Sequence, residues 1–337
     1  MDTYQRILGS ILGAAVGDAM GAATETKNTD MILQQYGDYV RELMPGQDGT
    51  FAAGCPRGLV TDDFSLAYYT ALELVKCRGE VTDKAAEHAL LQWAEHPEYY
   101  QFAGPTTRAS IDRIRGVEVP SQQLALACDN GKATDGSAMK IFPAGLIHPN
   151  DPDRAVLDAV TLCLPTHDTD ASLSGAGAIA AAVSTAAGGA GLEEVLKAGL
   201  YGARKGFEEG RKVGKQTSVA SVEKRIVLAI EIGKKSGSWE EHMRELSWII
   251  GSGLAVNEAV PCVFGILAAT SGDVMPAIEM GVNIGNDTDT VATMVGAIAG
   301  AMCGAEAIPA HFLQEIEGAN PMDLRQLAED IRTTFYQ

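Results

Sequence analysis

Two stretches near opposite ends of the chain carry a small residue at every fourth position. In the first they are Gly13, Gly17 and Gly21, and in the second they are Ala292, Gly296, Gly300 and Gly304. Residues four apart share one face of an α-helix, and a face without bulky side chains lets a second backbone approach closely. Each stretch therefore predicts a helix that packs at short distance against another helix.

Helical periodicity also dominates the rest of the sequence, whereas alternating runs of β-branched residues are almost absent. Ser238 and Glu241 form a capping box, which predicts the start of a helix. Asn320 and Pro321 are expected to be the N-cap and the first residue of the last helix. We predict an all-α fold, and the lack of a linker-like break in composition favours a single domain over residues 1–337.

The composition limits the location and the partners of the protein. Residues 1–6 run straight into a helical segment without the features of a signal peptide, so we expect a cytoplasmic protein. The most apolar stretches, 173–187 and 291–303, are shorter than the roughly 20 residues that cross a bilayer, which predicts buried helices and no membrane partner. The six cysteines form no C-x-x-C pair, which argues against a disulfide framework and a thiolate zinc site. A formal net charge of −18 argues against a nucleic-acid polymer as partner.

The sequence also contains two clusters of aspartate and threonine, each at the expected start of an Ala/Gly-rich helix. The clusters are Thr61-Asp62-Asp63 and Asp287-Thr288-Asp289-Thr290. Helix capping and the helix dipole account for one or two such carboxylates, so an over-capped helix is the simpler interpretation of either cluster alone. Four carboxylates brought together would repel one another unless cations neutralise them. A purely oxygen ligand set suits magnesium, manganese or calcium, so the two clusters together predict a metal-assisted hydrolase with two divalent cations.

Two further carboxylates belong to the first glycine-rich helix. Asp18 lies beside the small-residue face, where a buried carboxylate hydrogen-bonded to helix backbone is the favoured interpretation. Glu25 ends the segment, where a Gly/Ala-rich approach can place its side chain over an oxygen-lined site. Taken alone, Glu25 would be an ordinary surface residue.

These segments together resemble the ADP-ribosylglycohydrolase family, which includes the dinitrogenase reductase-activating glycohydrolases and the vertebrate ADP-ribosyl hydrolases. The resemblance runs from Gly9 to about Pro309 and rests on five motifs in order. Family patterns G-D-x-x-G-x-x-x-E, T-D-D, G-A-M-R-x-x-P-x-G, P-T-H and D-T-D-T resemble residues 17–25, 61–63, 136–145, 165–167 and 287–290.

The resemblance implies an orthogonal multi-helix domain with a central binuclear magnesium site, in which manganese can substitute. The implied metal ligands are Thr61, Asp62, Asp63, Asp287, Asp289 and Thr290. The implied catalytic residues are Glu25, Asp62, Asp63 and Asp289. Cations that hold the ribose hydroxyls and a water would promote attack at C1′ and hydrolysis of an N-ribosidic bond.

The sequence departs from the family pattern at three positions. Phe64 follows the T-D-D triplet where threonine is frequent, Asn286 replaces a frequent glycine, and Lys140 replaces arginine. A Cβ at position 286 and a point charge at position 140 would weaken the grip on a diphosphate. The candidate substrate-binding residues are Glu25, Gly104, Thr106, Asn130, Thr134, Ser137, Met139, Lys140, His167 and Asn286.

The sequence leaves several functions open. The leading hypothesis is magnesium-dependent hydrolysis of an N-ribosidic bond in an ADP-ribosyl or nucleoside-like substrate. Two-metal chemistry also permits a phosphohydrolase. The third alternative is a ligand-binding relative without turnover, which the intact ligand sets disfavour.

Overall fold

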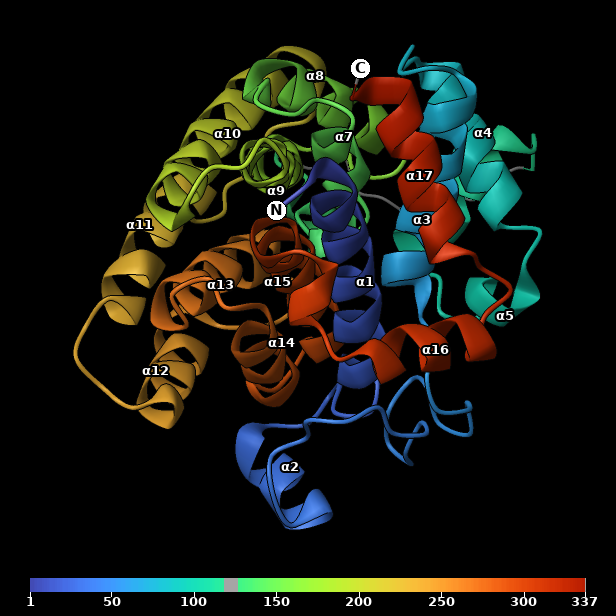
Figure 1. Cartoon of the computed structure of the whole chain (residues 1–337). Helices are drawn as coiled ribbons and strands as arrows, with labels where there is room; N and C mark the ends of the chain where they lie inside the picture. Colours follow the sequence, from blue (N-terminus) through green and yellow to red (C-terminus); the bar gives the residue numbers. More distant parts are fainter. Residues whose placement is uncertain (118–126, 337) are drawn as a thin grey trace.

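The computed structural model describes residues 1–117 and 127–336, and in these ranges every regular element is a helix, with no strand beyond three isolated bridges (Figure 1). The all-α prediction is therefore confirmed. The longer helices are α1 (Thr3–Gly21), α3 (Asp62–Lys76), α9 (Asp170–Ala187), α10 (Leu192–Val213), α13 (Val256–Ala269) and α15 (Thr288–Cys303).

The two small-residue faces predicted from the sequence pack against each other. A Cβ built on Gly13 of α1 would lie 2.3 Å from the backbone oxygen of Gly296 in α15, and one on Gly17 would lie 2.2 Å from that of Ala292. These pairs run in opposite directions along the two helices, so α1 and α15 are antiparallel. The end of α1 consequently meets the start of α15, and Gly21 lies directly against the backbone of Asp289.

The remaining helices surround this pair. Helix α9 packs against α10 by the same means, because a Cβ on Gly177 would lie 2.5 Å from the backbone oxygen of Gly202. Both of the most apolar stretches are buried over most of their residues, as predicted. The other α-helices are α2 (Thr29–Tyr36), α4 (Asp83–Trp93), α5 (Pro97–Tyr100), α6 (Pro105–Ile114), α7 (Phe142–Leu146), α8 (Pro152–Cys163), α11 (Val222–Gly233), α12 (Trp239–Glu245), α14 (Val274–Asn283), α16 (Ala310–Ala319) and α17 (Leu324–Phe335).

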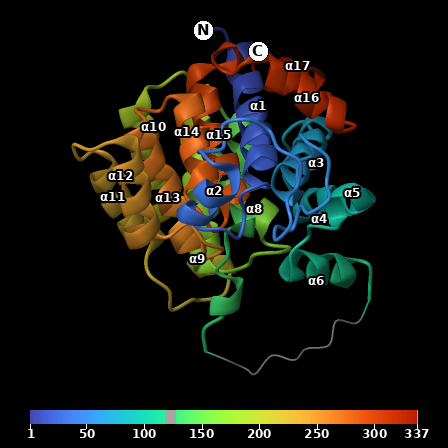
Figure 2. The ribbon, with the colours of Figure 1, turned by 90° about the horizontal axis from the view of Figure 1, so that it is seen from below.

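Helix α2 lies at one end of the molecule, and four short elements complete the described chain. In Figure 1 α2 lies below the end of α1, and the view from below in Figure 2 shows it in front of the central helices. Within the described residues no helix is long and apolar enough to cross a bilayer. The short elements are η1 (Asn130–Lys132), η2 (Asp135–Ser137), η3 (Leu246–Ile250) and η4 (Ala305–Ala307).

Of the two helix starts named from the sequence, one is confirmed and one is wrong. Ser238 and Glu241 form the predicted capping box at the start of α12. The last helix, however, begins at Leu324 behind the N-cap Asp323, and not at Pro321 behind Asn320. The side chain of Asn320 instead ends α16 and ties down a neighbouring loop, because its amide donates to the backbone oxygens of Ile316 and Gly58.

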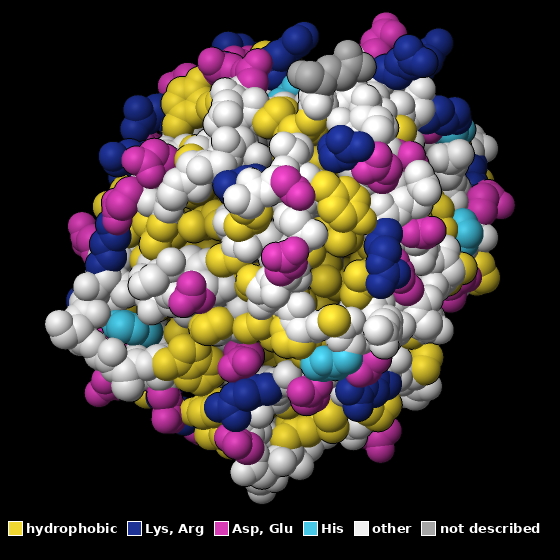
Figure 3. Space-filling view, in the orientation of Figure 1, with side chains coloured by type: hydrophobic (Ala, Val, Ile, Leu, Met, Phe, Trp, Pro, Cys, Tyr) yellow, Lys and Arg dark blue, Asp and Glu magenta, His cyan; other side chains and the backbone are white. Residues whose placement is uncertain are grey.

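Acidic and basic side chains are interspersed on the face shown in Figure 3, where no continuous basic stripe is visible. The formal net charge of the whole chain is −18.

Candidate active site

The two aspartate and threonine clusters meet at the starts of α3 and α15. Thr290 Oγ1 donates a 2.6 Å hydrogen bond to Asp63 Oδ1 and so links the two helices directly. Thr61 is the N-cap of α3, as predicted, and its hydroxyl also lies 3.2 Å from Asp63 Oδ2. The antiparallel packing of α1 and α15 delivers the second cluster to this point, so residues more than 220 positions apart form one site.

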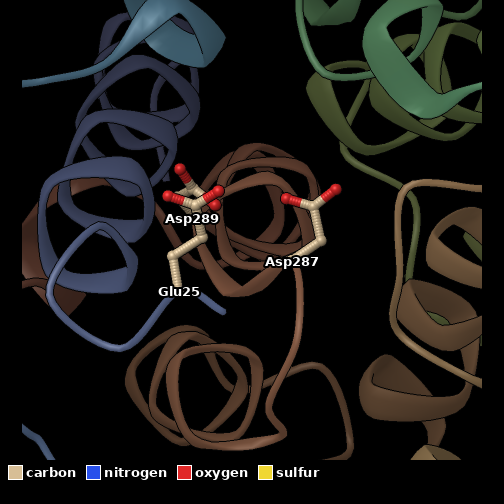
Figure 4. Close-up of side chains that lie close together, drawn as sticks. All are labelled: Glu25, Asp287 and Asp289. Atoms are coloured by element: carbon tan, nitrogen blue, oxygen red, sulfur yellow. The ribbon is translucent and has the colours of Figure 1, made fainter. Parts of the chain in front are cut away.

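The end of α1 adds a third acidic element. Figure 4 shows Glu25 reaching toward the start of α15, where its carboxyl lies beside that of Asp289, with Asp287 next to them. One carboxylate oxygen from each of these three residues lies within 4.8 Å of the other two. The glutamate is therefore part of the acidic site rather than a surface residue, with only 8% of it exposed.

The turn that carries Glu25 is held by the loop before α15. Thr26 N–H donates to the backbone oxygen of Asn286 at 2.8 Å, and Asn286 N–H donates to the backbone oxygen of Lys27 at 2.7 Å. Thr26 and Asn286 both have φ of 67°, in the left-handed region. Asparagine adopts this region more readily than most residues, so Asn286 does what a glycine would do at this position.

Asp18 fixes the position of the Thr61-Asp62-Asp63 triplet from behind. Its side chain is fully buried, and its carboxylate accepts backbone hydrogen bonds from Thr61 at 3.0 Å and from Phe64 at 2.8 Å. Burial raises its pKa to about 6, while these hydrogen bonds oppose the rise. The interpretation of Asp18 as a buried carboxylate bonded to helix backbone is confirmed.

Replacing Asp18 by alanine is expected to lower the free energy of unfolding by about 1–3 kcal/mol, because buried N–H groups at the start of α3 lose their acceptor. Urea unfolding of Asp18→Ala beside wild type measures the loss. Asp48→Ala, an exposed aspartate, is the matched control. A loss no larger than that of the control would contradict the structural role given to Asp18.

Several carboxylate oxygens at the site accept no hydrogen bond from the described residues. Asp135 Oδ2, Asp287 Oδ2 and Asp289 Oδ1 are buried and have no hydrogen-bond partner within the described part of the chain. Asp287 occupies the N-cap position of α15, yet its side chain makes no capping hydrogen bond there. Over-capping of helices therefore does not explain this cluster, whereas buried, unpartnered carboxylate oxygens fit a divalent cation.

The electrostatics of the site agree with that fit. Burial, followed by the charges of Asp287 and Asp62, raises the pKa of Glu25 to about 8. Burial and the charge of Asp18 raise the pKa of Asp62 to about 8 as well. Carboxylates that cannot all ionise side by side require protons or cations, and the oxygen-only donor set favours hard cations.

A cavity of about 410 Å³ opens at this cluster. Its acidic wall continues into an apolar rim that includes Phe51, Phe102 and Leu254. Six carboxylates and one histidine line the cavity, and no lysine or arginine does so among the described residues. The lining residues are Glu25, Phe51, Thr61, Asp62, Asp63, Gln101, Phe102, Ala103, Gly104, Pro105, Thr106, Thr107, Thr134, Asp135, Gly136, Met139, His167, Leu254, Asp287, Asp289 and Thr290.

The structure brings all six predicted metal ligands to the cavity, together with six of the ten predicted substrate contacts. Those six are Glu25, Gly104, Thr106, Thr134, Met139 and His167. The other four lie outside the lining. Ser137 bonds to the backbone of Ser172, and the Asn130 side chain pairs with Ser218. Lys140 is buried behind the wall of the cavity. The backbone of Asn286 is hydrogen-bonded to the turn that carries Glu25.

Among the carboxylates that line the cavity, Asp135 is the one that sequence reasoning missed. It lies in η2, is 3% exposed, and its carboxyl faces that of Asp287. Its pKa is raised well above the ordinary value by burial and by the charges of Asp287 and Asp63. An aspartate in a Gly-rich loop is usually a turn residue, so the sequence around Asp135 gave no separate signal.

Comparison with known proteins agrees with this geometry. A family model described as ADP-ribosylglycohydrolase matches residues 1–337. The Escherichia coli (strain K12) protein YegU is 28% identical over 328 residues, which cover 96% of this chain and 95% of that protein. The ADP-ribosylhydrolase ARH3 of Bos taurus is 27% identical over 359 residues, covering 99% and 94%. A solved structure described as an "ADP-ribosylglycohydrolase-related protein complex" matches with a TM-score of 0.68 and 25% identity over 98% of both chains. The chain therefore belongs to the ADP-ribosylglycohydrolase family.

Proposed function

We propose that the protein hydrolyses the N-ribosidic bond of a small riboside with the help of two divalent cations, magnesium in the first place. The convergence of unpartnered, buried carboxylate oxygens at one end of a cavity carries this proposal. The proposed ligands are those of the two clusters, Thr61, Asp62, Asp63, Asp287, Asp289 and Thr290. Bound there, the cations would supply positive charge for the ribose hydroxyls and for the attacking water.

The side chains of the protein divide the remaining work. Glu25 Oε accepts a proton from the attacking water, a role suited to a carboxylate that lies within 4.8 Å of the proposed ligands Asp287 and Asp289. Asp18 holds the start of α3, so that Asp62 and Asp63 keep their positions as the substrate binds. Phe102 and Met139 contribute apolar surface to the cavity lining, which would limit the contact of bulk water with the sugar.

The lining of the cavity supports a riboside without a diphosphate. Proteins often hold a diphosphate with arginine or lysine, whereas the charged lining residues described here are carboxylates. Lys140 and Asn286 lie outside the lining, so the reason for this preference differs from the one that the sequence suggested. Asp135 places a further carboxyl, and not a positively charged group, on the cavity wall.

The protein is expected to show a higher kcat/KM for a nucleoside-type N-riboside than for ADP-ribosyl-arginine. In Asp135→Asn, which replaces the carboxyl by an amide of the same size that cannot ionise, the ratio of the two values is expected to shift toward the ADP-ribosyl substrate by about tenfold, or about 1.4 kcal/mol. Asp48→Asn, on the exposed surface, is the control.

Steady-state assays with magnesium, following the release of free base or of arginine, decide the matter. A strong wild-type preference for ADP-ribosyl-arginine would refute the small-riboside proposal while leaving hydrolysis of an N-ribosidic bond intact. Release of inorganic phosphate in place of base or arginine would identify a phosphohydrolase instead.

A further inference from the structure

Lys140 carries a charged side chain into the interior directly behind the cavity wall. The residue is 3% exposed, and its Nζ donates a 2.8 Å hydrogen bond to Thr166 Oγ1. Burial lowers the pKa of Lys140, while the neighbouring thiol of Cys163 and the carboxylate of Asp62 raise it. Burying an amino group this deeply costs free energy unless the group is hydrogen-bonded, and Thr166 provides that hydrogen bond.

The hydroxyl of Thr166 passes this interaction on to His167. Thr166 Oγ1 lies 2.9 Å from His167 Nδ1 and 3.3 Å from the backbone oxygen of Cys163. Lys140 Nζ donates to this hydroxyl, so the single proton of the hydroxyl must go to one of the other two acceptors.

The geometry favours the imidazole as the acceptor of that proton. The backbone oxygen of Cys163 already accepts hydrogen bonds from Thr166 N at 3.0 Å and from His167 N at 2.8 Å. Both of its lone pairs are therefore in use, and the third contact is also the longest. His167 Nδ1, at the shorter distance, is left to accept the Thr166 proton.

An imidazole that accepts at Nδ1 carries its proton on Nε2. His167 lines the cavity, and a Cβ on Gly136 would lie 2.8 Å from its Nε2, so the absence of a side chain at position 136 leaves room for this edge of the ring. Burial, followed by the charges of Lys140 and Lys132, holds the pKa of His167 well below the ordinary value, which keeps the ring neutral. Gly136 lines the same cavity, so Nε2 lies against a residue of the cavity wall.

We infer that Lys140 and Thr166 form a relay that fixes His167 as the Nε2–H tautomer, and that this N–H group binds an acceptor atom of the substrate. His167 touches the substrate, whereas Lys140 and Thr166 are positioning residues. The second half of the inference rests on the proposed function, while the tautomer itself is a property of the protein without substrate.

Nuclear magnetic resonance of magnesium-loaded protein labelled with ¹⁵N-histidine tests the relay at about neutral pH. The chain has six histidines, and the His167→Gln variant assigns the signals of this one. The wild type is expected to show protonated Nε2 and unprotonated Nδ1. Thr166→Ser, which retains the hydroxyl, is expected to keep that pattern, and Thr166→Val is expected to lose it. The kcat/KM of Thr166→Val for the riboside is expected to fall by about tenfold, as for one lost hydrogen bond. This loss is expected to be larger than any loss of kcat/KM in Thr166→Ser.

Three results would overturn the relay. They are a protonated Nδ1 in wild type, an unchanged tautomer in Thr166→Val, and equal kinetic losses in the valine and serine variants. The wild-type spectrum alone decides the first, so the test survives if Thr166→Val does not fold. A wild type that shows the Nε2–H tautomer but hydrolyses no riboside would refute the proposed function and leave the relay standing.

Discussion

Asp289→Ala is expected to lower kcat by about 10²–10³-fold, the range seen when one group that stabilises the transition state is removed. Asp289 lies at the start of α15, its Oδ1 is buried without a hydrogen-bond partner, and its carboxyl lies beside that of Glu25. Removing it takes away a proposed ligand of the divalent cations. Steady-state kinetics with magnesium measure the fall in kcat, and calorimetric titration with manganese measures the loss of metal affinity.

The fold of this variant is expected to survive. In the metal-free protein Asp289 repels Glu25 and Asp63, and its pKa is raised well above the ordinary value by burial and these charges. Asp289→Ala without metal should thus be at least as stable toward urea as metal-free wild type, the opposite of Asp18→Ala. Equal manganese affinity in Asp289→Ala and wild type would refute the ligand assignment, and Asp48→Ala controls for the loss of one charge.

The central packing of the fold could be predicted in part from residue spacing. The glycine faces of α1 and α15 each predict a close neighbour, and the structure shows that each is the other's neighbour. Spacing identifies the face of a helix but not its partner, because Gly177 of α9 meets Gly202 of α10 by the same kind of contact. Pairing depends on the packing of the whole core, which no single segment encodes.

The candidate site could likewise be predicted only in part from the sequence. Residue chemistry pointed to the two clusters, because four carboxylates brought together repel one another unless cations neutralise them. Lys140 and Met139 illustrate the limit: they are adjacent in sequence, yet Met139 lines the cavity and Lys140 lies behind it. Which of two neighbouring side chains faces a site depends on the local backbone, and the short η2 turn before them has no periodicity to reveal it.

The proton balance of the site determines how its stability depends on metal and pH. In the metal-free protein the pKa values of Glu25 and Asp62 are each raised to about 8, from ordinary values of 4.5 and 3.8. Between the ordinary and the raised values, the folded protein retains protons that the unfolded chain has released. The stability of the metal-free protein is therefore expected to fall as the pH rises through this range, and the loss is complete above the raised pKa values.

Divalent cations should reverse this trend, because they bind the deprotonated carboxylates of the folded protein and displace their protons. The rise in melting temperature on adding magnesium is accordingly expected to be larger near pH 8.5 than near pH 7, and a chelator should remove both the rise and the hydrolytic activity. Both pH values lie above the range in which His167, with its lowered pKa, gains a proton. Calorimetry at the two pH values, with Asp289→Ala in parallel, measures the effect.

In the variant, which lacks a proposed ligand, magnesium should raise the melting temperature much less at either pH. A magnesium effect of the same size in wild type and variant would place the cation elsewhere, and full turnover in chelator would exclude the metal-assisted reaction altogether.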